Sequence, residues 1–190
     1  SVSQNLSIHS QNYSVMKAMI LAAGLGTRLN ELTQNRPKAL VEIQGKPLLA
    51  YVVEKLVKSG FTSIVVNVHH FAEQVIDYLK ANDFGAHIDI SDESSLLLNT
   101  GGGIFNARSF LDGTEPFLVH NVDILSDINL EAIMAFHLHN KQLATLAVGK
   151  RNSSRQFLFD EQMRLSGWRN TSTEKEVIPD TTRSPLNEYA

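Results

Sequence analysis

The chain of 190 residues is long enough to bury one substantial hydrophobic core. Hydrophobic residues make up 43% of it and charged residues 19%, which is typical of a globular protein and excludes a disordered one. The formal net charge of −3 argues against a nucleic-acid or anionic-membrane partner. The absence of cysteine excludes disulfides, thiolate catalysis and cysteine-based zinc sites, and it fits a cytoplasmic location. No run of 18 apolar residues occurs, so no transmembrane helix is expected.

The two ends of the chain differ in composition from its middle. Residues 1–15 are polar, rich in Ser, Asn and Gln, and without the apolar region of a signal peptide. We expect them to be a leader or an expression remnant, with the fold beginning near Met16. After Asn170 the sequence becomes polar again. No internal repeat and no interior linker is visible, so one domain is expected over residues 16–190.

The first predicted element is a buried strand, because Lys17–Leu21 is a short apolar run. A glycine-containing loop follows at residues 22–30. The next predicted element is a helix that starts at Pro47, a residue favoured at the first helical position. Apolar residues between Leu48 and Val57 recur at helical spacing, which indicates one face turned to the core.

Strands and helices then alternate along the chain. Further strands are expected at 63–68, 87–91, 117–120 and 144–148, helices at 72–81, 101–110 and 130–141, and a hairpin of 156–159 with 165–168. This alternation predicts an α/β fold, a Rossmann-like three-layer α/β/α sandwich with a mostly parallel sheet. Ligands of such sheets bind beyond the carboxyl ends of the strands. One rim should therefore carry the loops after Leu21, Val68, Ser91 and His120.

The loop after the first strand carries the strongest chemical signal. It reads Leu21-Ala22-Ala23-Gly24-Leu25-Gly26-Thr27-Arg28-Leu29 and is followed by Arg36-Pro37-Lys38-Ala39-Leu40. Small residues let backbone N–H groups approach a ligand, and consecutive N–H groups at a strand-to-helix turn form an anion site. Arg28 and Lys38 add the positive charge that a triphosphate needs. No GKS or GKT follows, which excludes a Walker loop, and Leu29 at the third glycine position argues against a dinucleotide-dependent oxidoreductase.

These motifs together resemble the sugar-1-phosphate nucleotidyltransferase, or NDP-sugar pyrophosphorylase, family. The pattern L-A-A-G-x-G-T-R-L followed by R-P-K-A-L is similar to the signature of that family. The segment Leu98–Gly103 resembles its T-G-G-G loop, and Phe117–Asp127 resembles the strand that bears a metal-binding aspartate. The resemblance covers roughly residues 16–168, with the motifs in the family order.

The resemblance implies a reaction and a set of site residues. A nucleoside triphosphate and a sugar-1-phosphate would be the substrates, and Mg²⁺ the cofactor. The backbone at Leu21, Ala22, Ala23 and Gly24 would contact base and ribose, and Gly26, Thr27 and Arg28 the phosphates. The base and the sugar would be bordered by Glu93, Thr100, Gly101 and Gly102. The catalytic residues implied are Arg28, Lys38 and Asp123, with Asp123 as the metal ligand. No general base is needed, because the attacking phosphate is already ionised.

Two departures from the family pattern bear on activity. The family usually has Gly-Asp or Asp-x-Asp at the metal strand, whereas this sequence reads Asn121-Val122-Asp123, in which Val122 replaces a small residue. The family also continues to a Trp-x-Asp segment with a second metal-binding carboxylate, whereas Trp168 is followed by Arg169 and Asn170. We therefore expect a domain truncated at its C-terminal end. The alternative is a non-catalytic module that binds nucleotide or sugar phosphate.

The T-G-G-G-I loop indicates the nearest members of the family. It is most similar to that of N-acetylmuramate-1-phosphate uridylyltransferases and mannose-1-phosphate guanylyltransferases, which favours UTP. Neither the sugar nor the oligomeric state follows from the sequence.

Overall fold

The computed structural model describes residues 15–26, 31–179 and 187–190. The chain clusters into two compact units, Ser1–Asn140 and Lys141–Ala190, where the sequence predicts one domain over 16–190. No linker composition marks the boundary between them. Within the described residues, no helix is long and apolar enough to cross a membrane.

A four-stranded parallel sheet forms the centre of the first unit. Its strands lie in the order β5-β4-β1-β6. They are β1 (Met16–Leu21), β4 (Phe61–Val68), β5 (His87–Asp92) and β6 (Phe117–Asn121). The helices are α1 (Leu48–Lys58), α2 (Ala72–Ala81), α3 (Asn99–Asn106), α4 (Arg108–Leu111) and α5 (Leu130–Asn140). A short 3₁₀ helix, η2 (Lys38–Leu40), and a two-stranded hairpin of β2 (Glu42–Ile43) and β3 (Lys46–Pro47) precede α1.

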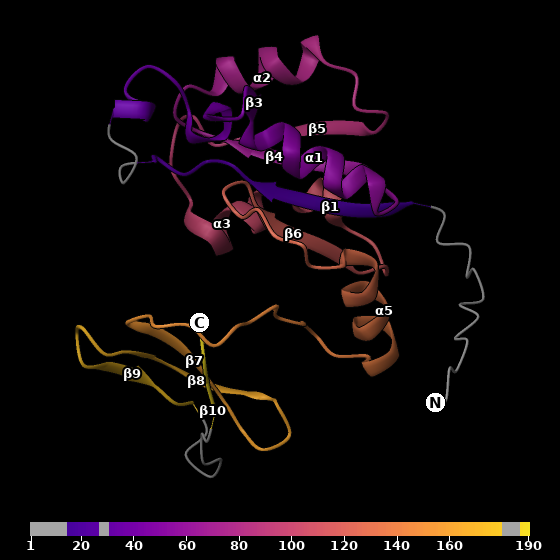
Figure 1. The fold of residues 1–190 in the computed structure, drawn as a ribbon. Coiled ribbons are helices and arrows are strands. Elements are labelled where there is room, and N and C mark those ends of the chain that lie inside the picture. Colours follow the sequence, from indigo (N-terminus) through magenta and orange to yellow (C-terminus); the bar gives the residue numbers. More distant parts are fainter. Residues whose placement is uncertain (1–14, 27–30, 180–186) are drawn as a thin grey trace. The chain divides into compact units, whose positions relative to one another are not determined.

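Helices cover both faces of this sheet (Figure 1). Successive strand residues point to opposite faces, so β1 and β4 contribute to two separate cores. Ala18 and Ile20 belong to a cluster with the apolar faces of α1 and α2. Met19 and Val65 belong to a second cluster with Ala107 of the α3–α4 segment. The expected three-layer α/β/α arrangement is therefore confirmed.

Two predicted elements differ from the observed ones. The helix expected over 101–110 is two helices, α3 and α4, which meet at Ala107. Ala107 is fully buried and packs with Met19 and Val65 of the sheet. The strand predicted over 144–148 is wrong, since these residues form no strand. An apolar run becomes a strand only where a neighbour supplies hydrogen bonds, and sequence periodicity does not report that neighbour.

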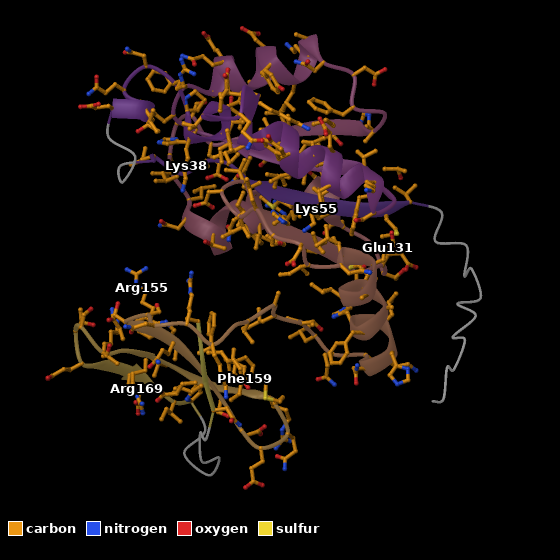
Figure 2. The ribbon with its side chains drawn as sticks, viewed as in Figure 1. Lys38, Lys55, Glu131, Arg155, Phe159 and Arg169 are labelled. Atoms are coloured by element: carbon orange, nitrogen blue, oxygen red, sulfur yellow. The ribbon has the colours of Figure 1, made fainter. Side chains whose placement is uncertain are left out.

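The second unit is a four-stranded antiparallel sheet in the order β10-β7-β8-β9. Its strands are β7 (Arg155–Phe159), β8 (Leu165–Asn170), β9 (Lys175–Val177) and β10 (Asn187–Tyr189). The predicted hairpin is confirmed as β7–β8, and Phe159 and Arg169 come from its two strands (Figure 2). Arg169 forms ion pairs with Glu176 of β9 and Glu188 of β10.

Asp160 closes the β7–β8 turn. One of its carboxylate oxygens accepts from the backbone N–H groups of Gln162, at 3.0 Å, and Arg164, at 2.8 Å, and the other accepts from Arg164 Nε at 2.7 Å. The hydrogen bond from the Arg164 backbone, together with those from its side chain, lowers the pKa of Asp160 below its usual value.

A depressed pKa makes this turn sensitive to acid. The ionised Asp160 carboxylate stabilises the folded state above the unfolded-state pKa of about 4, and this stabilisation is lost as the pH falls through the folded-state pKa. We expect Asp160→Asn to lower the unfolding temperature at neutral pH and to flatten its decline under acid conditions. Thermal unfolding from neutral to acid pH checks this, with Glu161→Gln, an exposed neighbour, as control. An unchanged acid decline in the Asn variant would contradict it.

Candidate active site

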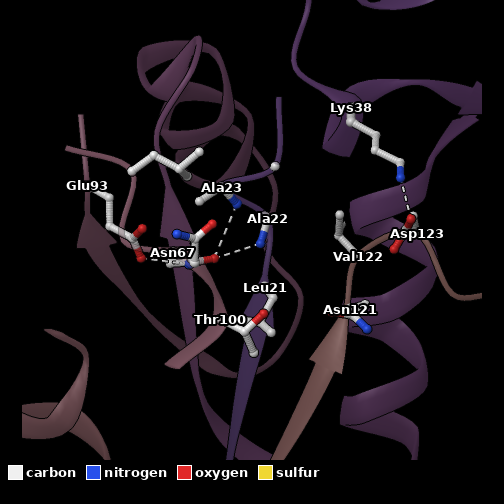
Figure 3. A pocket seen from close by; sticks show the side chains of 13 residues that line it. Leu21, Ala22, Ala23, Lys38, Asn67, Glu93, Thr100, Asn121, Val122 and Asp123 are labelled. Atoms are coloured by element: carbon white, nitrogen blue, oxygen red, sulfur yellow. Dashed lines mark hydrogen bonds and ion pairs between the residues drawn. The ribbon is translucent and has the colours of Figure 1, made fainter. Parts of the chain in front are cut away.

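A cavity of about 250 Å³ opens at the carboxyl ends of β1, β4 and β6 (Figure 3). Its lining residues come from the loops that follow the strands, from η2 and from the N-terminal turn of α3. They are Leu21, Ala22, Ala23, Gly24, Lys38, Asn67, Glu93, Leu97, Asn99, Thr100, Asn121, Val122 and Asp123. The sequence predicts a ligand rim after these strands, and this cavity lies at that rim. The first turn of α3 also presents the end of a helix that favours anions.

Strand register brings polar side chains to one row of the sheet. Leu21 pairs with Asn67 on one side and with Asn121 on the other, and Asn67 pairs in turn with Ser91. All four residues lie within two positions of the carboxyl ends of their strands. Because parallel strands end on the same side of the sheet, Leu21, Asn67 and Asn121 of this row all line the cavity.

Asn67 fixes the start of the loop after β1. Its Oδ1 accepts from the backbone N–H groups of Ala22, at 2.7 Å, and Ala23, at 3.3 Å. The Nδ2 group of Asn67 donates to Glu93 Oε1 at 2.7 Å, and the N–H of Leu98 donates to Glu93 Oε2 at 3.2 Å. Figure 3 shows this chain of contacts along one wall of the cavity. Sequence reasoning missed Asn67, although one polar residue within the apolar strand Ser63–Val68 was its signal.

Lys38 and Asp123 face each other across the other side of the cavity (Figure 3). The Nζ group of Lys38 forms an ion pair with Asp123 Oδ2. Both side chains are partly exposed, 24% and 39%, so a ligand can reach them. Two residues 85 positions apart thus form one charged pair, as expected if both serve the same phosphate groups.

Gly26 brings the loop close to η2. Its φ of +68° lies in the left-handed region, and an added Cβ would come within 2.9 Å of Thr33 Cγ2 and 3.2 Å of Lys38 Cβ. The Thr33 hydroxyl donates to the carbonyl of Gly26 at 3.1 Å. The glycine is therefore required both by conformation and by this close approach.

Val122, the departure from the family pattern, is compatible with the site. Its N–H donates to the carbonyl of Leu21 at 3.1 Å, which extends the β1–β6 pairing by one residue. Its side chain is 4% exposed and joins the hydrophobic cluster beneath α1. Val122 thus anchors the segment that carries Asp123.

His120 lies in β6, three residues before Asp123. Burial lowers the pKa of its imidazole, outweighing the hydrogen bond to the carbonyl of Asn121. The nearby ammonium of Lys55 lowers this pKa further. Lys55 itself binds the carbonyl of Ser126 at 2.6 Å, so helix α1 holds the loop after β6.

The expected site residues divide into three groups. Those that the structure brings to the cavity are Leu21, Ala22, Ala23, Gly24, Lys38, Glu93, Thr100 and Asp123. Gly26, Gly101 and Gly102 are not among the lining residues, and Gly101 borders a separate hollow beside Phe105 and Arg108. Thr27 and Arg28 lie outside the described residues. Lining residues not expected from the sequence are Asn67, Leu97, Asn99, Asn121 and Val122.

Two carboxylates line this cavity, those of Asp123 and Glu93, and both oxygens of Glu93 accept hydrogen bonds from within the protein. Among the described residues, no group of three or more His, Asp or Glu side chains is arranged to hold a metal. Mg²⁺ is commonly held by one or two carboxylates together with water and substrate phosphates, not by a complete protein cage. Asp123 lines the cavity and is partly exposed, so its position fits such a metal.

The parallel sheet with helices on both faces, and the cavity at its strand ends beside the paired Lys38 and Asp123, define an α/β protein of the Rossmann-like class. The chain belongs to the nucleotidyl transferase family, whose sequence profile matches residues 17–157.

Relatives with assigned names indicate which members of the family this chain is similar to. It is 48% identical over 109 residues to an N-acetylmuramate alpha-1-phosphate uridylyltransferase of Caulobacter vibrioides, which covers 56% of this chain and 45% of that protein. It is 38% identical over 138 residues to the mannose-1-phosphate guanyltransferase beta-B of Xenopus laevis, covering 71% of this chain and 38% of that protein. The chain thus spans about half the length of such relatives, or less.

Solved structures support the fold. A crystal structure of HddC from Yersinia pseudotuberculosis superposes with a TM-score of 0.65 at 23% identity, covering 86% of this chain and 72% of that one. A UDP-glucose pyrophosphorylase complexed with UDP-glucose superposes with a TM-score of 0.65 at 19% identity, covering 92% of this chain and 75% of that one. The Rossmann-like fold class is therefore confirmed.

Proposed function

We propose that this protein transfers a nucleotidyl group from a nucleoside triphosphate to a sugar-1-phosphate, releasing pyrophosphate and forming an NDP-sugar. The observation that carries the proposal is the meeting of Lys38 and Asp123 at one cavity with the loop after β1. A cation and a glycine-containing loop favour the binding of phosphate, and the carboxylate of Asp123 would hold a metal ion beside them. The names of the relatives support the same reaction class.

The reaction needs positioning and charge neutralisation more than protein bond chemistry. A sugar-1-phosphate oxygen attacks the α-phosphorus in line; a new P–O bond forms, and the bond between the α-phosphorus and the bridging oxygen breaks. The electron pair of that bond leaves with pyrophosphate. Lys38, together with Arg28, offsets the crowded negative charge. Mg²⁺ bound at Asp123 would supply further neutralisation and hold the phosphates in line.

UTP is the triphosphate we propose, on the similarity to uridylyltransferases. GTP is the alternative, because guanylyltransferases are also among the relatives. The sugar is proposed only as a class, a hexose-type sugar-1-phosphate.

A second candidate is a non-catalytic module that binds nucleotide or sugar phosphate. It is favoured by the absence, among the described residues, of any group of three or more His, Asp or Glu side chains that could hold a metal ion.

Pyrophosphate release separates these candidates. The 190-residue chain is assayed with Mg²⁺, each of the four nucleoside triphosphates and a panel of sugar-1-phosphates. Release with one pair of substrates is expected. Nucleotide binding without release would favour the module, and the absence of any nucleotide binding would overturn both.

A further inference from the structure

We infer that Asn67 is a positioning residue that orients the nucleotide-binding loop, and that Glu93 fixes the direction of the Asn67 amide. This inference rests on the proposed function, because it assigns a task to residues beneath the proposed nucleotide site. Neither residue needs to contact the reacting atoms. Their hydrogen bonds determine where the backbone of Ala22 and Ala23 lies.

The network permits only one orientation of the Asn67 amide. The backbone N–H groups of Ala22 and Ala23 can only donate, so the oxygen of Asn67 must face them. A carboxylate can only accept, so the nitrogen of Asn67 must face Glu93. A flipped amide would oppose donors to donors at one end and acceptors to acceptors at the other. The chemistry of the neighbours thus fixes the amide direction.

Glu93 is itself fixed at three points. Its backbone N–H donates to the carbonyl of Val68 at 2.8 Å, and its own carbonyl accepts from His69 Nδ1 at 2.6 Å. Its second carboxylate oxygen accepts from the N–H of Leu98, just before α3. Asn67 and Glu93 are 3% and 2% exposed, so water cannot replace a lost partner readily. The network therefore links four segments: the loop after β1, the end of β4, the residue after β5 and the start of α3.

This arrangement determines which loop amides remain for a ligand. The amides of Ala22 and Ala23 are used within the protein, and the carbonyl of Leu21 accepts from Val122. The start of the loop is thus held from β4 on one side and from the segment after β6 on the other. The loop amides left for a ligand therefore begin at Gly24, and their direction would depend on the peptides that Asn67 holds.

An exchange of the two groups tests the inference. In Asn67→Asp, two carboxylates face each other in a buried site; in Glu93→Gln, the amide cannot accept from both Asn67 and Leu98. The double variant restores every bond, because the carboxylate now at position 67 accepts from the loop amides, while the amide now at position 93 donates to that carboxylate and accepts from Leu98. Each single variant should weaken Mg²⁺–UTP and Mg²⁺–GTP binding by about 10- to 100-fold, and the double variant should recover most of it.

Calorimetric titration at mildly alkaline pH keeps the added carboxylate ionised. Val75→Ala, a buried substitution in α2 away from the cavity, serves as a control for lost stability. It should lower the unfolding temperature without changing nucleotide affinity. Amide hydrogen exchange at Ala22 and Ala23, measured by NMR without nucleotide, should accelerate in both single variants and slow again in the double variant.

The outcomes separate this inference from the proposed function. The positioning role alone would be overturned if Asn67→Asp bound nucleotide with wild-type affinity. It would also be overturned if the double variant did not recover the affinity lost in the single variants. A wild-type chain that binds no nucleotide would overturn the proposed function, and the amide-exchange pattern would then decide whether Asn67 orients the loop. Loss in each single variant with recovery in the double supports the inference.

Discussion

Replacement of Asp123 by Asn is expected to reduce pyrophosphate release by about 100- to 1000-fold while leaving the fold intact. The carboxylate is partly exposed and makes its ion pair with Lys38 at the cavity rim, so little of the hydrophobic core depends on it. Loss of its charge removes the proposed metal ligand. Release kinetics together with thermal unfolding measure the two effects separately.

Lys38→Met should produce a different pattern at the same ion pair. Turnover should also be lost, because the ammonium group no longer neutralises phosphate. Binding of free Mg²⁺ or Mn²⁺ should instead become tighter, since Asp123 no longer has a competing cation. Lys46→Met, which breaks the exposed pair with Glu54 outside the cavity, is the matched control and should change neither quantity. Full turnover in Asp123→Asn, or weaker metal binding in Lys38→Met, would contradict the assignment.

Gly103→Ala is the substitution expected to damage the site most without changing any charge. An added Cβ would lie 2.7 Å from Glu93 Oε1 and 2.9 Å from Asn67 Nδ2. Neither group can retreat, because both are buried and hydrogen-bonded. Overpacking of this kind costs about 1–3 kcal/mol, which corresponds to several degrees of unfolding temperature. Nucleotide affinity should fall as well, since the clash separates α3 from the loop that Asn67 holds.

Gly101→Ala provides a stability control within the same helix. Nothing lies within 4 Å of its added Cβ, so the change adds only the higher helix propensity of alanine. Its unfolding temperature should rise, by the equivalent of up to about 1 kcal/mol. Opposite shifts of the two variants in differential scanning calorimetry are the expected result. Equal shifts would show that contact with Glu93 does not limit position 103.

The first half of the fold could be predicted from the sequence because its signals are local. The apolar run ending at Leu21 and the stripe between Leu48 and Val57 report burial directly, and both elements formed as expected. The rim position followed from the same reasoning, because strand order along the chain implies parallel crossovers. The motif residues Lys38 and Asp123 then met there.

The features that the sequence did not predict depend on contacts between segments that lie far apart in the chain. Residues 144–148 have strand composition but form no strand, and no local pattern reports whether a neighbour is available. The role of Asn67 depends on Ala22 and Glu93, which lie 45 and 26 positions away. A polar residue within a strand indicates that something is bonded there but not what the partner is. The break at Ala107 likewise follows from packing against the sheet.

The site can form only when β1 and β4 pair in the native register, in which Leu21 lies beside Asn67. A slip of one residue between β1 and β4 would turn the amide of Asn67 to the opposite face of the sheet and leave the Ala22 and Ala23 amides without their acceptor. A misregistered chain would therefore have no affinity for nucleotide, even if its core were largely buried. Because a ligand stabilises only the state that binds it, a nucleotide at 100 times its Kd would favour the native register by about 2.7 kcal/mol. A nucleotide present during refolding would thus increase the fraction of chains with the native pairing of β1 and β4.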